Sequence, residues 1–248
     1  FRSALDRGMK ELYGTGLYEA LNDDTGDTLW VLSNAITSRY ENYFDWYGTV
    51  MKHTHTSRIL KPVHPDYLCA LEEGKGGDEL AYIDLIARVD ALIGFYDDTE
   101  ILSFEGVERG AGFSVTDVDS LDEMIDWFCS LCERRQVRSY KQLQAYSRTL
   151  SVAEMSREDA VRALNVILAA RGENNADECR RECIAVQDYI QRRILEEADR
   201  RRLPYQIHTG MTTLHDAHPG LLEPLIRRYT NVRFALLHAY PFVSEAAY

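Results

Sequence analysis

Two histidines near the C-terminal side of the chain each stand where a short apolar strand pattern ends. A turn or breaker residue follows each of them, Gly210 after His208 and Pro241 after His238. A helical pattern lies between, so the spacing predicts a strand–helix–strand unit with parallel strands. Parallel α/β folds place their chemistry at the carboxyl ends of strands, and we therefore expect both imidazoles in one mouth, as part of a metal or acid–base site. The alternative for His208 is a buried, hydrogen-bonded residue before a turn.

Cationic residues stand near the ends of two other predicted strands. The segment 137–146 is predicted as a strand that contains Lys141, and a lysine within a parallel sheet is either functional or on an edge. Arg148 follows in the next loop, on the side of the sheet where anions are met. Arg88 and Asp90 share one side of an earlier strand near its carboxyl end. They either hold substrate or form an ordinary ion pair.

Two further groups of potential metal ligands are less well placed. His53 and His55 form an H-x-H pair, which metal sites use, but they precede a strand and so belong to its amino end. Polar loop histidines are the favoured interpretation. The five cysteines have no framework spacing, which suits a reducing cytoplasm. Four of them form two pairs within helical patterns, where buried helix cysteines are favoured over a zinc site: Cys129, Cys132, Cys179 and Cys183.

The composition is that of an ordinary globular protein. With 248 residues, 45% hydrophobic and 27% charged, the chain is long enough for one barrel-type domain or two small ones. It has no apolar run of about 18 residues, as a membrane span needs, and its start shows no secretory signal. The net charge of −12 argues against nucleic acid and anionic membranes as partners. We expect a cytoplasmic protein with a small-molecule substrate; a homo-oligomer is compatible, since barrel enzymes commonly self-associate.

Strand and helix patterns alternate along most of the chain. Residues 1–56 are predicted to be a helical segment that packs on a barrel, with a helix over 29–51 whose aromatic residues form a core stripe rather than a ligand-lining surface. Residues 57–248 are predicted to be α/β, a (β/α)8 TIM-type barrel. Eight strands make a barrel, so we expect this one to be incomplete in the chain. The expected strands cover 57–63, 82–90, 137–146, 204–208 and 232–238; the expected helices cover 117–135, 156–170 and 177–201, the last with a solvated charged face.

The C-terminal pattern resembles a known family. The runs L-P-Y-Q-I-H-T-G-M over 203–211, P-x-L-L-x-P-L-I over 219–226 and V-x-F-x-L-L-H-x-Y-P over 232–241 look like the amidohydrolase-related metal-dependent hydrolases. These TIM-barrel proteins include aminocarboxymuconate-semialdehyde-type decarboxylases and the hydrolase-like amino-terminal domain of some fungal glutamine synthetase-like proteins. The segment 141–150 is similar to the fourth-strand region of that family. The resemblance covers about 110 residues, from position 137 onward.

The resemblance implies a role for each matching residue. His208 corresponds to a metal ligand, and His238 to a second ligand or a catalytic base. Lys141 is the second predicted catalytic residue, while Arg148, Tyr146 and Arg88 are predicted to bind substrate. The family also uses an H-x-H at the end of strand one and an aspartate at the end of strand eight. Neither is found here in the right context, so we expect them to lie outside this sequence or to have been lost.

The implied activity is metal-dependent hydrolysis. A divalent ion, zinc first, activates a water that attacks a carbonyl carbon at a C–N or C–O bond, and a cation binds the substrate carboxylate. Two alternatives remain open. The first is a decarboxylase or isomerase on the same scaffold, and the second is a barrel-derived domain without catalytic activity.

Overall fold

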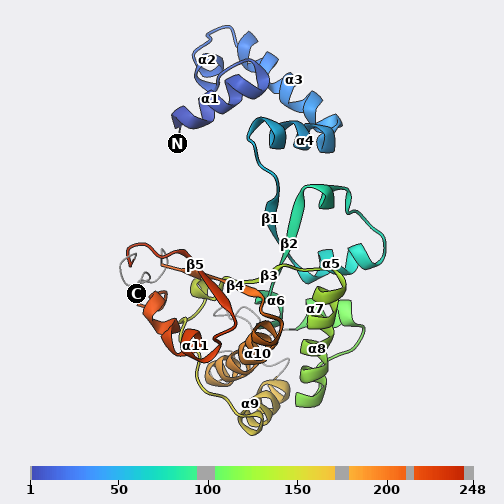
Figure 1. Ribbon diagram of the computed structural model, residues 1–248, viewed down its shortest axis with the longest axis vertical. Coiled ribbons are helices and arrows are strands. Elements are labelled where there is room, and N and C mark those ends of the chain that lie inside the picture. The colour runs from blue at the N-terminus through green and yellow to red at the C-terminus, as the bar shows by residue number, and fades with distance from the viewer. Residues whose placement is uncertain (1, 94–103, 171–178, 211–214, 243–248) are drawn as a thin grey trace. The chain divides into compact units, whose positions relative to one another are not determined.

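A computed structural model describes residues 2–93, 104–170, 179–210 and 215–242. The chain divides into two compact units. The smaller unit comprises residues 1–59 and 78–83, and the larger comprises 60–77 and 84–248. Figure 1 labels the helices and strands of both units.

The smaller unit is helical, as predicted for the first segment of the chain. Asp6 ties its first two helices together, because its carboxylate accepts a hydrogen bond from the Tyr18 amide at 2.7 Å. The Tyr13 and Trp46 rings pack at a centroid distance of 5.2 Å. Gly48 lets the helix backbone approach Tyr82, whose hydroxyl would lie 2.7 Å from an added Cβ. The elements are α1 (Arg2–Tyr13), α2 (Leu17–Leu21), α3 (Asp27–Glu41), α4 (Tyr43–His53) and η1 (Asp78–Ala81).

The helix predicted over 29–51 is two helices, and the predicted aromatic core stripe is wrong. The backbone leaves helical geometry at Asn42 (φ −122°, ψ 58°), between α3 and α4. This break divides the expected face, and Tyr40, Tyr43 and Phe44 are exposed, Tyr40 to 65%. Their rings pack in sequence on one another, at centroid distances of 5.8 and 5.3 Å.

The larger unit is built on a five-stranded sheet in the described residues, with strand order β1-β2-β3-β4-β5. Strands β2 to β5 pair in parallel, each with its neighbour in the sequence. Sequential order with helical crossovers is the arrangement of a (β/α) barrel. The strands are β1 (Ile59–Val63), β2 (Ile83–Arg88), β3 (Ser139–Gln142), β4 (Pro204–Thr209) and β5 (Arg233–His238).

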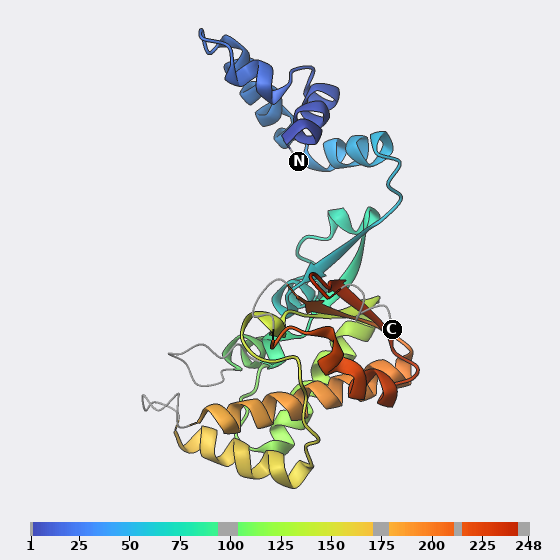
Figure 2. The ribbon, with the colours of Figure 1, turned by 90° about the vertical axis from the view of Figure 1, so that its left-hand side faces the viewer.

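Helices connect these strands. Helices α8 to α11 lie on one side of the sheet (Figures 1 and 2). Between the sheet and α8, the rings of Tyr140, Tyr205 and Phe128 are fully buried, and the two tyrosine rings meet edge to face at 6.3 Å. The connecting elements are α5 (Pro65–Glu72), α6 (Asp90–Ile93), α7 (Glu105–Ala111), α8 (Val118–Arg134), η2 (Gln144–Tyr146), α9 (Arg157–Ala169), α10 (Arg180–Arg201), η3 (Pro219–Leu222) and α11 (Glu223–Arg228).

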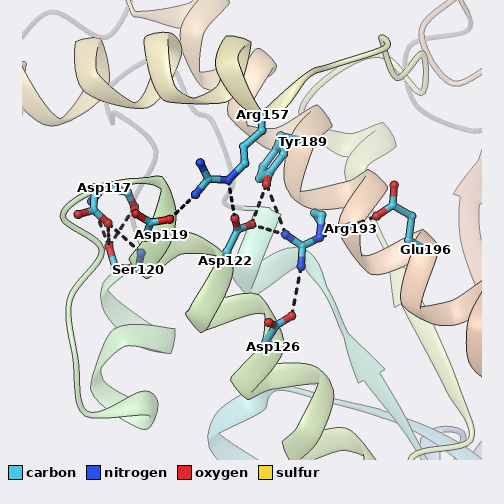
Figure 3. A network of polar contacts seen from close by, with 9 residues as sticks. All are labelled: Asp117, Asp119, Ser120, Asp122, Asp126, Arg157, Tyr189, Arg193 and Glu196. Atoms are coloured by element: carbon cyan, nitrogen blue, oxygen red, sulfur yellow. Dashed lines mark hydrogen bonds and ion pairs between the residues drawn. The ribbon is translucent and has the colours of Figure 1, made fainter.

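A polar network joins α8, α9 and α10 behind the sheet (Figure 3). Its centre is Asp122, which accepts a hydrogen bond from the Tyr189 hydroxyl at 2.7 Å and pairs with Arg157 at 3.2 Å and with Arg193. Exposed ion pairs contribute little one by one, but Asp122 is half-buried and shared by all three helices. The start of α8 is fixed by a capping box of Asp117 and Ser120.

Two predictions about the helices and strands need correction. The strand expected over 137–146 comprises only Ser139–Gln142, because the chain turns into η2 directly afterwards. The charged face of α10 was predicted to be solvated, yet Asp188 and Arg192 are among its buried polar residues. They bond to Arg148 and Ala153 in the segment after β3 rather than facing water. Among the described residues, no helix has the length and apolar character needed to cross a membrane.

Candidate active site at the carboxyl end of the sheet

The pairing of β4 with β5 brings the two strand-end histidines together, as predicted. Thr209 is the register partner of His238, and His208 is that of Leu237. The imidazole rings of His208 and His238 lie 4.5 Å apart, centroid to centroid. His208 is only 3% exposed, whereas His238 is exposed to solvent. The arrangement therefore offers one desolvated imidazole and one that an incoming molecule can reach.

A close backbone contact fixes the two loops that follow these strands. Gly210 has φ +64°, and a Cβ at this position would lie 2.1 Å from the carbonyl oxygen of Tyr240. The Gly210 amide donates to the Ala217 carbonyl at 2.8 Å, and the Thr209 hydroxyl donates to the Leu237 carbonyl at 3.0 Å. Only glycine combines this conformation with this approach. The turn after His208 thus holds the loop after His238 in place.

Tyr146 covers the buried histidine. Its ring lies 4.3 Å from the His208 ring, while the residue as a whole is 62% exposed. It belongs to η2 and not to β3, because the strand ends at Gln142. The ring thus lies between the imidazole and solvent, and the substrate-binding role of Tyr146 stays a prediction.

Lys141 and Arg88 occupy neighbouring positions on one face of the sheet. Arg88 is the register partner of Lys141, which is in turn the partner of Gln206. Lys141 lies in β3, the third strand of five in the described sheet, so it is not an edge lysine. Arg88 forms the ion pair that was one of its two predicted roles, with 3.2 Å between its Nε and Asp90 Oδ2. Burial raises the pKa of Asp90, whose other oxygen accepts from the Leu143 amide at 2.6 Å.

His208 is held in the neutral form. Burial lowers its pKa from the ordinary value of 6.5, and the nearby charges of His238 and Lys141 lower it further. Its Nε2 is buried and has no hydrogen-bond partner among the described residues. Buried polar nitrogens are normally satisfied, so this one is available to a ligand. A neutral imidazole with a free nitrogen is what a divalent metal ion binds.

The described residues fit such a metal ion in part. His208 supplies a free nitrogen, and His238 lies beside it. Within the described ranges no group of three or more histidine, cysteine, aspartate or glutamate side chains is arranged to hold a metal. Two imidazoles are fewer than the three protein ligands typical of catalytic zinc. The described residues therefore supply two imidazoles, fewer ligands than a complete metal site needs.

No protein-family model and no curated protein matches this chain. Solved structures do. Glucuronate isomerase from Caulobacter crescentus shares 17% identity and a TM-score of 0.64, over 95% of this chain and 51% of that protein. Uronate isomerase from Thermotoga maritima shares 10% identity and a TM-score of 0.56, over 77% of this chain and 46% of that protein. The larger unit is an arc of a TIM-type barrel. The chain spans about half the length of these structures, and the likeness establishes the fold alone.

Arg148, predicted to bind substrate, is held by α10 and by its own loop. Its side chain is 5% exposed and its Nη2 donates to Asp188 Oδ1 at 2.7 Å. Further bonds reach the Ser151 carbonyl at 2.9 Å and the Gln187 side chain at 3.1 Å. Asp188 also accepts from the Ala153 amide at 2.9 Å. The guanidinium thus anchors the loop after β3, which carries Tyr146, to α10.

Glutamines of β3 and α10 form a second support that was not predicted from the sequence. The Gln142 side-chain oxygen accepts from Gln191 and from the Tyr205 hydroxyl, both at 2.8 Å. Its nitrogen donates to Gln144 at 2.9 Å, and Gln144 donates to the Thr149 carbonyl at 2.6 Å. The sequence signal for this network is a stripe of polar residues at i, i+4 spacing in α10. Such a stripe marks a buried face only when the elements that pack against it are known.

The other candidate ligands lie elsewhere. His53 belongs to the smaller unit, where its Nε2 lies 3.2 Å from Glu11. Four of the five cysteines are buried, in helices or at a helix end, and no zinc group is formed by the described residues. Burial raises the pKa of Cys129 to about 12, so this thiol is unreactive at neutral pH. The favoured prediction of buried helix cysteines is confirmed.

Proposed function

We propose that this chain contributes half of the active site of a metal-dependent enzyme with the amidohydrolase-type barrel fold, acting at a carbonyl carbon of a small carboxylate-bearing substrate. The observation that carries the proposal is the buried, unpartnered Nε2 of His208 beside His238, at the carboxyl end of a parallel sheet. This end of the strands is where barrel enzymes assemble their chemistry.

Each residue of the site has a role in this proposal. A bound divalent ion, zinc first, polarises a carbonyl and lowers the pKa of a bound water toward ~7. His208 offers its free nitrogen to that ion, since its lowered pKa keeps it neutral. His238 is exposed and adjacent, and it moves a proton to or from the substrate. Lys141 and Arg88 provide positive charge for the substrate carboxylate, and Tyr146 contacts the substrate from the solvent side.

Two reactions suit this arrangement. In hydrolysis a water attacks an amide, ester or lactone carbonyl, and His238 delivers a proton to the leaving group. In aldose–ketose isomerisation His238 moves a proton between the carbonyl carbon and its neighbour. The second candidate is supported by the match to glucuronate isomerase over 95% of the chain, and by the positive charge of Lys141 near His208, which suits a sugar acid.

A paired assay distinguishes the two reactions. The protein that contains this chain is loaded with Zn²⁺ and incubated with hexuronates, N-acyl amino acids and lactones in H₂¹⁸O. Hydrolysis places ¹⁸O in the product carboxylate, whereas isomerisation gives a ketose without obligatory incorporation of ¹⁸O into a carboxylate. We expect His208→Gln to abolish turnover and His55→Gln, the matched control, to leave it unchanged. Full turnover by His208→Gln would overturn the proposal, and stable folding with neither metal binding nor turnover would favour a non-catalytic domain.

A further inference from the structure

The opposite end of the same strands has a cavity lined by arginines. Its volume is about 640 Å³, and it lies where β3, β4 and β5 begin, at the carboxyl ends of α8 and α10. All of its lining residues belong to the larger unit. It is named the arginine pocket here. The residues are Glu133, Gln136, Val137, Arg138, Arg201, Arg202, Leu203, Pro204 and Arg233.

The positive charge of the arginine pocket is poorly neutralised. Arg138 Nε is 3.8 Å from Asp84, and Arg201 Nε is 3.8 Å from Glu197, both longer than a hydrogen bond. Arg202 and Arg233 have no ion-pair partner among the carboxylates that the structure describes. Glu133 is the one acidic residue in the lining. Four arginines thus gather in a chain whose net charge is −12.

Stabilisation of helix ends does not account for two of the arginines in the pocket. Cationic residues commonly stabilise the carboxyl ends of helices, and Arg201 and Arg202 stand at the end of α10. Arg138 and Arg233, by contrast, lie at the starts of β3 and β5, and both are exposed. They come from separate strands and meet the helix-end arginines only in the folded sheet.

The backbone around the pocket favours glycine at two positions that carry long polar side chains. Gln136 and Arg202 follow α8 and α10 in left-handed conformation, with φ values of 53° and 55°. Each lies in a turn closed by the amide of the next residue, from Val137 to the Cys132 carbonyl and from Leu203 to the Ala198 carbonyl, both at 2.9 Å. Helix-ending turns of this type prefer glycine because a Cβ is strained there. Both strained side chains line the pocket.

We propose that the arginine pocket binds a small organic phosphate carrying a diphosphate group. Guanidinium groups recognise phosphate by paired N–H···O bonds, and four of them line this pocket, from two strand starts and a helix end. A volume of about 640 Å³ falls within the roughly 300–1,000 Å³ of small-molecule sites. The site lies at the other end of the strands from the histidine pair. Its occupancy is therefore independent of the function proposed above.

Calorimetric titration with ADP, inorganic pyrophosphate and citrate at 150 mM salt tests this proposal. We expect saturable 1:1 binding of ADP and pyrophosphate, and binding of citrate at least tenfold weaker. Arg138→Gln and Arg233→Gln should each weaken ADP binding about tenfold, as loss of a charged hydrogen bond does. Arg162→Gln on α9, whose side chain is 71% exposed, is the matched control and should bind as the unmodified protein does.

A second variant separates binding from folding. Arg202→Gly removes a guanidinium and relieves a left-handed residue, so it should weaken ADP binding while raising the thermal midpoint. Several results would overturn the proposal: no saturable binding of ADP or pyrophosphate, equal affinity for citrate, or an equal loss in Arg162→Gln. Binding of an acidic peptide in place of ADP would likewise reject a small phosphate as the occupant.

Discussion

Nitrogen-bearing side chains gather at both ends of strands β3 to β5. The two groups differ in their exposure to solvent. At the carboxyl end, His208 is 3% exposed and its free nitrogen is buried. At the amino end, the Arg138 side chain is 63% exposed, and its nearest carboxylate lies 3.8 Å away. A desolvated group acts strongly by itself, whereas solvated charges act weakly and several must converge. Two imidazoles thus form the described part of the first site, whereas four arginines line the second.

Both ends of the strands hold residues in left-handed backbone conformation. Gly210 takes its left-handed conformation where the Tyr240 carbonyl leaves no room for a side chain. Gln136 and Arg202 take that conformation although glycine is preferred, and their side chains extend into a cavity. His238 and Ala239 also have positive φ values, 71° and 53°. Strain of this kind persists where surrounding structure holds it in place, often at functional sites.

Loss of the buried ion pair between Arg148 and Asp188 should have the largest effect on stability. Asp188→Ala leaves the Arg148 guanidinium buried without its carboxylate, and the free energy of unfolding should fall by roughly 3–5 kcal/mol. Urea unfolding measures this change. The control is Glu223→Ala, which breaks an exposed 2.8 Å pair with Arg227 and should alter stability by less than ~0.5 kcal/mol. Similar losses for the two variants would mean that burial does not distinguish these regions.

Two glycine variants test the close approach of the histidine loops. Gly210 and Gly112 both have positive φ, but only Gly210 has a backbone atom in the path of a Cβ. Alanine at either position should lose about 1–2 kcal/mol through left-handed strain. Gly210→Ala should lose roughly 1–3 kcal/mol more through overpacking. Thermal unfolding of both variants gives the difference, and equal losses would show that the Tyr240 loop simply moves aside.

The amino end should gain stability when its strain is relieved. Arg202→Gly should raise the free energy of unfolding by roughly 0.5–1 kcal/mol, since the left-handed strain disappears and the greater entropy of glycine in the unfolded chain offsets part of the gain. Arg227→Gly, at a helical position of α11, should instead lose about 1 kcal/mol. A loss in Arg202→Gly would mean that the side chain stabilises the turn.

The smallest expected effect is a pH dependence that belongs to His208 in the metal-free protein. Its pKa lies below the ordinary 6.5 in the folded state, chiefly through burial. Between these two pKa values the unfolded chain binds the proton more readily, so the free energy of unfolding should fall as the pH drops from about 6.5 through the folded pKa.

NMR titration of the imidazole measures this pKa directly. Lys141→Met should bring the His208 pKa closer to 6.5, because a neighbouring positive charge is lost. Chemical unfolding at a series of pH values should show a smaller pH dependence for His208→Gln. A His208 pKa at or above 6.5 would contradict the description of a desolvated imidazole.

Local patterns predicted most of the α/β elements and the meeting of the two histidines. The apolar runs that end at His208 and His238 specified β4 and β5, and the short helical connection between them specified parallel pairing. Boundaries were predicted less well where polar residues are buried. The pattern through Tyr146 continued a strand that the structure ends at Gln142, because hydrogen bonding to Gln191 and Gln144 turns the chain.

Contacts between distant segments explain what the sequence could not predict. Arg148 looked available to substrate because Asp188 is 40 positions away and its burial depends on the packing of α10. The arginine pocket draws on positions 133 to 233, and no local motif joins them. Gly210 was recognised as a turn residue, but the carbonyl that makes glycine necessary belongs to Tyr240 in the next loop.

Cobalt binding tests the central claim, that His208 and His238 form part of a metal site. Co²⁺ is added to the protein, and visible absorption bands of nitrogen-ligated cobalt are followed together with the imidazole NMR signals. We expect saturable binding that perturbs His208 and His238, that is lost in His208→Gln, and that persists in the control His53→Gln. Binding that survives His208→Gln, or that His53→Gln abolishes, would contradict it.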